Sequence, residues 1–265
     1  MPETLNHYQL GKGSVNLLFL HGLASDSGFW LPLISMIDKS KYTIHSIDLK
    51  GHGKSSFYNK NFLPSQLSHE VNESLIKYDL NDFILVCHSY GGRVGLNMLL
   101  SGTSSLAPSQ LLILDTYWPE YQQRPSLQSV LERSADSSKI DPVADNVPVS
   151  ATHALNLMHA RLKKTTLHVK QKRSKNLAAW ENIIKDERLC QTIDSQVDEH
   201  IDLKKLKKLH GKVKLVYGGD SLFLASGQQA SMSLGLDLHI IDNARHFFPR
   251  FQAAPLAELI NELKI

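Results

Sequence analysis

The feature that most constrains this chain is the segment Leu85–Gly95, which reads LVCHSYGGRVG. A short apolar run, Phe83–Val86, leads into a small residue, a histidine, a serine and a glycine pair, and a segment with helical apolar spacing follows. This is the pattern of a nucleophile elbow, in which a serine lies on a turn so tight that the residues two before and two after it must be small. The pattern predicts that Ser89 is a nucleophile at the end of a buried strand.

One position departs from the usual G-x-S-x-G form of the elbow. Cys87 holds the first small position, and its Cβ crowds the turn more than a glycine would. A serine at the start of a helix also serves in many proteins only to cap that helix. The elbow by itself therefore leaves two interpretations of Ser89 open, a nucleophile and a helix cap.

Length and composition indicate a globular protein. The chain has 265 residues, enough for one α/β domain with an insertion or for two small domains, and 42% of them are hydrophobic. A net charge of +3 is too small to indicate nucleic-acid binding by itself. Residues 1–6 contain an acid and no apolar core, so we expect no secretory signal, and no apolar run approaches the ~20 residues of a membrane span. The two cysteines, Cys87 and Cys190, favour a reducing compartment, so we expect a cytoplasmic location.

Short apolar runs bounded by turn residues recur along the chain, as in strands that are buried on both faces of a parallel sheet. They are Val15–Leu20, Thr43–Ile47, Phe83–Val86, Leu111–Leu114, Val213–Tyr217 and Leu238–Ile241. Helical patterns lie between them, over Leu67–Leu80, after the elbow, and after Pro255 near the end. This alternation predicts an α/β fold with a mostly parallel, doubly wound sheet.

One interval breaks the alternation. From about Pro119 to Lys208 there is no convincing strand, but Ala154–Leu162 and Leu177–Ile184 have helical spacing. We predict that residues 1–118 and 209–265 form the core, and that residues 119–208 are a helical cap inserted into it.

Three further segments add to the evidence from the elbow. Leu18–Ala24 reads as a strand that ends in His-Gly, Asp48–Ser55 has the form D-x-x-G-x-G-x-S, and Asp242–Pro249 places a histidine between a strand and the last helix. Together with the elbow, these segments resemble the α/β-hydrolase family, within its large group of esterases, epoxide hydrolases and haloperoxidases. The resemblance covers residues of about 15–115 and 212–265.

The resemblance implies an assignment for each catalytic role. His246 corresponds to the catalytic base, although Arg245 replaces the glycine that is common before it. The favoured acid is Asp220, because the family places the acid after the strand that precedes the histidine strand, here Val213–Tyr217, and Asp220 is the only carboxylate there. The order Ser89, Asp220, His246 is also the chain order expected of this fold. Asp115 is the alternative acid, and a strand-end aspartate also caps turns.

The backbone N–H groups of Leu23 and Tyr90 correspond to the oxyanion hole. The expected reaction is hydrolysis of a carboxylic ester through an acyl-enzyme on Ser89, without a metal or an organic cofactor. A serine nucleophile argues against the epoxide-hydrolase and haloalkane-dehalogenase branches, which need a carboxylate. Two alternatives remain: a C–C bond hydrolase or lyase that uses the same triad, and a hydrolase-like receptor that binds a ligand without turnover.

The cap contains a basic stretch, residues 161–175, with seven cations and no acid. The cations are Arg161, Lys163, Lys164, Lys170, Lys172, Arg173 and Lys175. The plainer interpretation is a solvated helix face. The more specific interpretation is a docking surface for an acidic acyl carrier protein, through complementary charge. The core is also similar to the biotin-pathway esterases that cleave the methyl ester of pimeloyl-carrier protein. Aromatic residues are not interleaved with these cations, so we expect neither nucleic acid nor a membrane as the partner.

Overall fold

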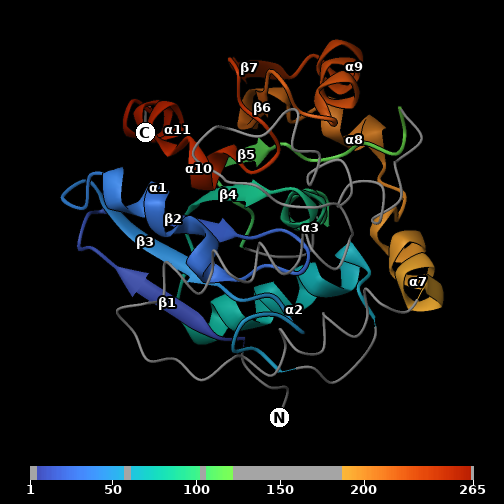
Figure 1. Ribbon diagram of the computed structural model, residues 1–265. Coiled ribbons are helices and arrows are strands. Elements are labelled where there is room, and N and C mark those ends of the chain that lie inside the picture. Colours follow the sequence, from blue (N-terminus) through green and yellow to red (C-terminus); the bar gives the residue numbers. More distant parts are fainter. Residues whose placement is uncertain (1–4, 57–60, 102–105, 122–186, 264–265) are drawn as a thin grey trace, which may run out of the picture.

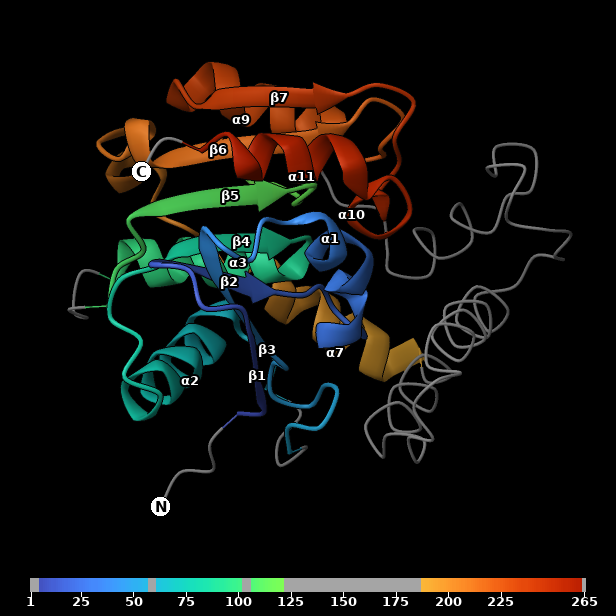
Figure 2. The same ribbon diagram turned by 90° about the vertical axis from the view of Figure 1, so that its left-hand side faces the viewer.

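The computed structural model describes residues 5–56, 61–101, 106–121 and 187–263. These residues form a seven-stranded sheet with the strand order β1-β3-β2-β4-β5-β6-β7, and Figure 2 shows the strands stacked from β7 at the top to β1 at the bottom. The strands are β1 (His7–Leu10), β2 (Val15–Leu20), β3 (Tyr42–Ile47), β4 (Ile84–His88), β5 (Gln110–Leu114), β6 (Val213–Gly218) and β7 (Asp237–Ile241).

All strands except β1 are parallel, and their register places their carboxyl ends at one edge of the sheet. Leu20 at the end of β2 is level with Ile47 of β3 and with Cys87 of β4, and Cys87 is level with Ile113 of β5. Ligands of open α/β sheets bind outside this edge. The residues that follow β2, β4 and β5 therefore lie within reach of one another.

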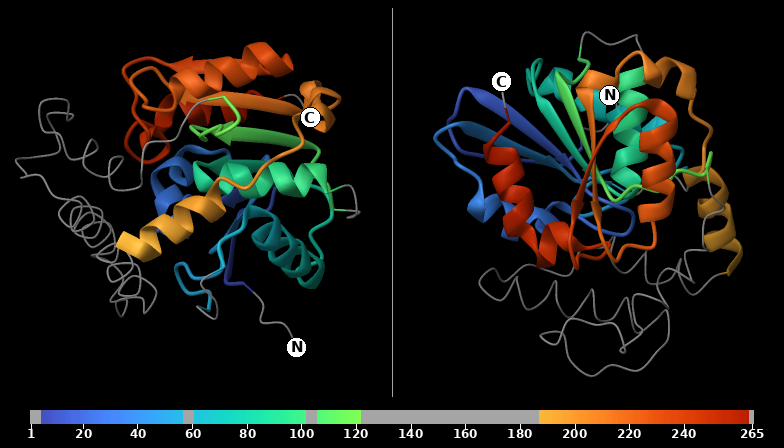
Figure 3. Two further views of the ribbon diagram at one scale, coloured as in Figure 1. Left: turned by 90° about the vertical axis from the view of Figure 1, so that its right-hand side faces the viewer. Right: turned by 90° about the horizontal axis from the view of Figure 1, so that it is seen from above.

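Helices cover both faces of the sheet, as Figures 1 and 3 show. On one face lie α2 (Pro64–Lys77), α3 (Tyr90–Leu100), α7 (Glu187–Val197), α8 (Leu203–Lys207) and α9 (Leu224–Leu234). On the other lie η1 (Ser27–Trp30), α1 (Leu31–Met36), α10 (Phe248–Phe251) and α11 (Ala253–Asn261), while the short η3 (His210–Lys212) leads into β6.

Side chains of one strand alternate between the two layers because successive residues of a strand point to opposite faces. Leu18 and Leu20 of β2 pack in the layer with α2 and α3, whereas Leu17 and Phe19 pack with α1 and α11. The central strands are therefore apolar on both faces, which is why each was recognisable as a continuous apolar run.

The predicted fold class is confirmed, and each of the six expected strands forms within one or two residues of its expected bounds. The strand β1 was not foreseen. It is a four-residue edge strand with three exposed residues that pairs antiparallel with β3, so it lacks the continuous apolar run by which the other strands were predicted. Among the residues that the structure describes, no helix is long and apolar enough to cross a membrane.

Of the interval 119–208, the structure describes residues 119–121 and 187–208. Ile193 and Val197 of α7 and Leu206 of α8 are buried in the same apolar cluster as α2 and α3. The core boundaries and the inserted cap stay predictions. The seven basic residues of 161–175 lie outside the described residues.

Candidate active site

Ser89 lies between β4 and α3 in a backbone conformation that an L-residue rarely adopts. Its φ is 53° and its ψ is −121°. Outliers of this kind persist only where the surrounding structure enforces them, and they cluster at functional sites. Ser89 occupies the N-cap position of α3, but its side chain makes no capping hydrogen bond. The helix-cap interpretation therefore does not describe what this hydroxyl does.

The small residues of the elbow are required by close approaches. A Cβ at Gly91 would lie 2.6 Å from the carbonyl oxygens of Leu20 and His21, so no larger residue fits there. On the other side of the turn, the Cys87 sulfur lies 2.7 Å from where a Cβ of Gly95 would be. Cysteine is thus accommodated at the first small position because Gly95 leaves room for its side chain. Burial raises the pKa of the Cys87 thiol well above its ordinary value, so the thiol stays protonated.

The carboxylate of Asp115 lies against the imidazole of His246. Nδ1 of His246 is 2.7 Å from Oδ2 of Asp115, and Asp115 is fully buried at the end of β5. Asp115 also accepts hydrogen bonds from the backbone N–H of Gly218 and the hydroxyl of Ser221. An ionised carboxylate only accepts, so Nδ1 carries a proton, and in a neutral ring Nε2 carries none.

This geometry corrects the favoured assignment of the acid to Asp220. The side chain of Asp220 is exposed, whereas its backbone N–H donates to the carbonyl of Ala244 at 2.8 Å. Gly218 allows this contact, since a Cβ there would lie 2.3 Å from the same carbonyl oxygen. Asp220 therefore helps to hold the loop that carries His246 through its main chain, and the carboxylate beside the imidazole is that of Asp115.

The strand that carries Asp115 also binds the elbow directly. The backbone N–H of Ser89 donates to the carbonyl of Leu114 at 2.8 Å, and the hydroxyl of Thr116 donates to the carbonyl of Ser89 at 2.8 Å. Asp115 itself has a φ of 49°. Two residues with strained backbones, Ser89 and Asp115, are thus tied to each other across neighbouring strands, as preorganisation of a reacting group requires.

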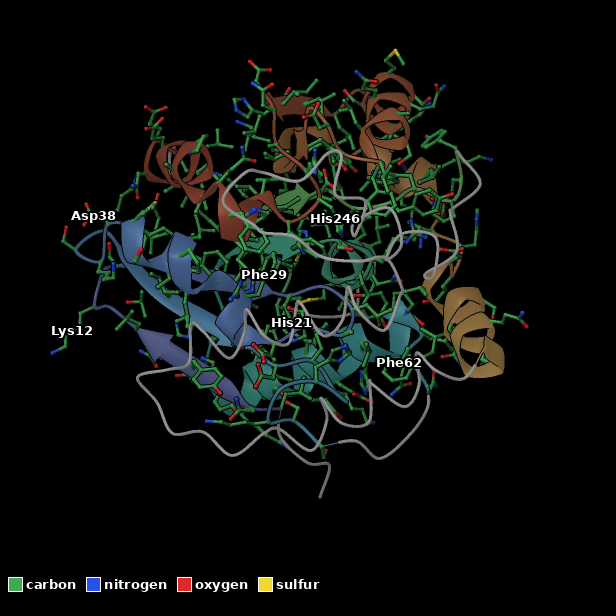
Figure 4. The ribbon with its side chains drawn as sticks, in the orientation of Figure 1. Lys12, His21, Phe29, Asp38, Phe62 and His246 are labelled. Carbon is green, nitrogen blue, oxygen red and sulfur yellow. The ribbon has the colours of Figure 1, made fainter. Side chains whose placement is uncertain are left out.

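His88, the residue before Ser89, fixes the loop of His246. Its Nε2 is 2.7 Å from the carbonyl oxygen of His246, and the two rings lie 4.7 Å apart. His88 is buried and stacks on Phe29, and burial lowers its pKa well below the ordinary value, so the ring is neutral and Nε2–H donates. Figure 4 shows Phe29 and His246 in the middle of the molecule, whereas Lys12 and Asp38 lie at its edge.

The two expected oxyanion donors flank Ser89. Tyr90 is the first residue of α3, where a backbone N–H has no partner within the helix. Leu23 follows Gly22, and a Cβ at Gly22 would lie only 3.2 Å from Cβ of Ser89. The loop after β2 therefore passes directly beside the serine, and the next residue, Ala24, has a left-handed φ of 56°.

The structure thus brings Ser89, His246, Asp115, Leu23 and Tyr90 to the carboxyl edge of the sheet and leaves Asp220 outside this group. Sequence reasoning did not single out His88, Thr116 and the buried His52. Each bonds to a backbone group of a distant segment, namely the carbonyl of His246, the carbonyl of Ser89 and the N–H of Ala24, and no local pattern encodes such contacts. Among the described residues, no group of three or more histidine, cysteine, aspartate or glutamate side chains is arranged to hold a metal ion.

The sequence matches the alpha/beta hydrolase family over residues 17–259. It is 31% identical to a probable lysophospholipase, BODYGUARD 4 of Arabidopsis thaliana, over 146 residues, which are 54% of this chain and 34% of that protein. It is 32% identical to the pimeloyl-[acyl-carrier protein] methyl ester esterase of Wigglesworthia glossinidia brevipalpis over 89 residues, 34% of this chain and 32% of that protein. The chain thus matches about a third of the length of these relatives.

Among solved structures, the fold is similar to that of a meta-cleavage product hydrolase from Pseudomonas fluorescens. The TM-score is 0.68 at 15% sequence identity, and the match covers 97% of this chain and 92% of the other. At this identity the similarity concerns the fold alone.

Proposed function

Because the chain belongs to the alpha/beta hydrolase family, we propose that it is a serine hydrolase of carboxylic esters with the triad Ser89, His246 and Asp115. The observation that carries the proposal is the 2.7 Å hydrogen bond between His246 and the buried Asp115 carboxylate. The loop of His246 is also hydrogen-bonded to His88, the residue before Ser89. A carboxylate that fixes one imidazole nitrogen leaves the other to act as a base toward a hydroxyl.

The proposed reaction passes through an acyl-enzyme. Nε2 of His246 takes the proton of Ser89 while the serine oxygen attacks the ester carbonyl, and the imidazolium that forms is stabilised by Asp115. The backbone N–H groups of Leu23 and Tyr90 bind the oxyanion. The tetrahedral intermediate then expels the alcohol, which takes the proton from His246. Water, deprotonated by the same imidazole, finally releases the carboxylic acid and regenerates Ser89.

One relative is named a methyl ester esterase and another a probable lysophospholipase, and the first of these names supports an ester as the substrate class. The competing interpretations are a C–C bond hydrolase or lyase, which labelling of Ser89 without hydrolysis of p-nitrophenyl esters would favour, and a non-catalytic receptor. A receptor would not need a strained serine whose hydroxyl caps nothing, together with an imidazole that is fixed by a buried carboxylate.

Ser89→Ala tests the proposal directly. Loss of a triad nucleophile lowers kcat by about 10⁶-fold, so we expect hydrolysis of p-nitrophenyl esters to fall to background and labelling by a fluorophosphonate to disappear. Ser101→Ala, at the other end of the same helix, is the matched control, and we expect it to keep both the hydrolysis and the labelling. Equal labelling of the Ser89→Ala and wild-type proteins would refute Ser89 as the nucleophile, and the absence of both labelling and turnover in the wild type would favour the receptor.

Within this class, we propose that the substrate is an acyl chain on an acidic carrier protein, such as a carrier-bound methyl ester. The support is the basic stretch of 161–175 and the partial similarity to the pimeloyl-carrier esterase. Reversing the charge of Lys170, Lys172 and Arg173 should raise KM for a carrier-bound ester and leave KM for a small soluble ester unchanged. Equal effects on both substrates would contradict the carrier as a partner.

A further inference from the structure

We propose that His21 and His52 are positioning residues that lock the peptide planes on both sides of the oxyanion donor Leu23. This inference rests on the proposed function, since it gives these residues a role in the same site. Both side chains are fully buried, and neither touches the reacting groups of the triad in the contacts described above. Figure 4 shows His21 near the middle of the view, below Phe29 and His246.

The two histidines belong to neighbouring loops. His21 begins the loop that follows β2, and His52 lies in the loop that follows the adjacent parallel strand β3. Nε2 of His21 accepts the backbone N–H of Leu49, in the second loop, at 3.0 Å. Nε2 of His52 accepts the backbone N–H of Ala24, in the first loop, at 3.0 Å. Each loop thus supplies the acceptor for a backbone donor of the other.

The partners of the second ring nitrogens determine the tautomers. Nδ1 of His21 is 2.8 Å from the carbonyl oxygen of Gly22, and Nδ1 of His52 is 2.8 Å from that of Lys50. A carbonyl only accepts and a backbone N–H only donates, so both rings carry their proton on Nδ1 and leave Nε2 bare. Both rings must therefore be neutral, and the burial of each favours the neutral form.

These contacts act on the two peptide groups that flank Leu23. The carbonyl of Gly22 and the N–H of Leu23 belong to one planar trans peptide, so they point in opposite directions. The bond from His21 to the Gly22 carbonyl therefore sets the direction of the Leu23 N–H. The bond from Ala24 to His52 fixes the next peptide plane. A flip of the first plane would turn the donor away from the oxyanion and would break the hydrogen bond to His21. A flip of the second plane would break the buried hydrogen bond to His52, which holds the chain directly after the donor.

The turn that presents His52 is itself held in place. Gly51 and Gly53 have φ values of 75° and 50°, and a Cβ at Gly53 would lie 2.3 Å from the Asp48 carboxylate. That carboxylate accepts the backbone N–H groups of Ser27 and Lys54. The D-x-x-G-x-G-x-S segment, whose residues take no direct part in the chemistry, thus serves to place the imidazole of His52 under the oxyanion loop.

The test compares His52→Phe, which removes the acceptor, with His52→Gln, whose amide oxygen is able to accept near the position of Nε2. One oxyanion donor contributes about 10²–10³ in rate, so we expect His52→Phe to lower kcat by at least about tenfold with little change in KM, and His52→Gln to recover part of the loss. Binding of a trifluoromethyl ketone, whose adduct with Ser89 carries an oxyanion, should weaken in parallel. Binding of the product acid should not.

His45→Phe is the matched control, because it removes another buried histidine, on β3, that makes hydrogen bonds away from the site. A loss of kcat in His45→Phe equal to that in His52→Phe would mean that a general loss of packing is being measured, and would overturn the inference. Unchanged kcat and ketone affinity in His52→Phe would also overturn it.

A second measurement is independent of turnover and does not require a variant that folds. Long-range ¹H–¹⁵N NMR correlations of the wild-type protein report the tautomer of each histidine, and we expect Nδ1–H at both His21 and His52. An Nε2–H tautomer at either residue would refute the reciprocal hydrogen bonds. If the wild type has these tautomers but no fluorophosphonate labels Ser89, then the proposed function fails and the hydrogen bonds stand.

Discussion

At the scale of single residues, the site depends on which carboxylate reaches the imidazole. Asp115 does so because β5 ends beside β6 and because its own carboxylate is held by Gly218 and Ser221. A buried carboxylate with three donors is fixed in one orientation, and this in turn fixes the ring of His246. The exposed side chain of Asp220 has no such surroundings.

Asp115→Asn and Asp220→Asn should therefore have very different effects on turnover. In a triad, replacement of the acid by its amide lowers kcat by about 10⁴-fold, because the wrong imidazole tautomer is stabilised. We expect a loss of this size for Asp115→Asn and a change of less than about threefold for Asp220→Asn, measured with a p-nitrophenyl ester at saturation. The reverse order of the two effects would restore Asp220 as the acid.

Ser89, His246 and the oxyanion positions were each proposed from a local pattern at a strand end, and their roles stay predictions. The sequence favoured Asp220 over Asp115, because both lie just after strands and nothing local in the sequence shows which one faces His246. That choice depends on the path of the loop before His246, where Gly218 and Asp220 contact Ala244. Contacts between segments so distant in sequence have no local signal.

At the scale of elements, α3 links the elbow to both described ends of the interval predicted as a cap. The guanidinium of Arg93 donates to both carboxylate oxygens of Glu120, at 3.1 and 2.9 Å, and also to the carbonyl of Glu199. Glu120 in turn accepts the backbone N–H of Ile201 at 3.3 Å. The helix that begins directly after Ser89 therefore contacts both described parts of this interval.

Arg93→Met tests how strongly this contact stabilises the fold. The side chains of Arg93 and Glu120 are 4% and 7% exposed, and removing one partner of a buried ion pair leaves an uncompensated charge, which costs about 3–5 kcal/mol. We expect a loss of that size in the free energy of unfolding from urea titrations. In the double variant Arg93→Met, Glu120→Leu, the loss should be smaller than the sum of the two single losses.

Lys50→Met is the control for this prediction, because Lys50 forms an ion pair with Glu70 that is more exposed, at 22% and 13%. Exposed pairs contribute about 1 kcal/mol or less, so this variant should unfold close to the wild type. An Arg93→Met protein as stable as Lys50→Met would show that the Arg93 contact does not hold the two ends of the interval.

The elements themselves were predictable to different degrees. The central strands are buried on both faces, so their apolar runs were sufficient to place them, whereas the edge strand β1 has mostly exposed residues and was missed. The helix predicted over Leu67–Leu80 begins earlier, at Pro64, and ends at Lys77. Proline is favoured in the first turn of a helix, a signal that the apolar spacing alone did not use.

At the scale of the whole molecule, the charge state of the buried histidines couples stability to pH. Among the residues that the structure describes, burial lowers the pKa of five histidines, and that of His45 falls to about 4. The others are His7, His21, His52 and His88. In the unfolded chain a histidine titrates at a pKa of about 6.5, so below that pH the unfolded state binds protons that the folded state does not.

The free energy of unfolding should therefore fall as the pH decreases from about 6.5, since stability rises with pH wherever the unfolded state binds more protons. Asp26 acts in the opposite sense, because burial raises its pKa, but it is one group against five. Urea titrations at pH 7.5, 6.0 and 5.0 measure the slope. In His45→Gln, the free energy of unfolding should change less between pH 6.0 and 5.0. The unfolded variant lacks one titrating imidazole, so its slope against pH should decrease by the equivalent of up to one bound proton. A free energy of unfolding that is constant over this range would mean that these histidines are protonated in the folded protein, which the backbone N–H groups facing Nε2 of His21 and His52 oppose.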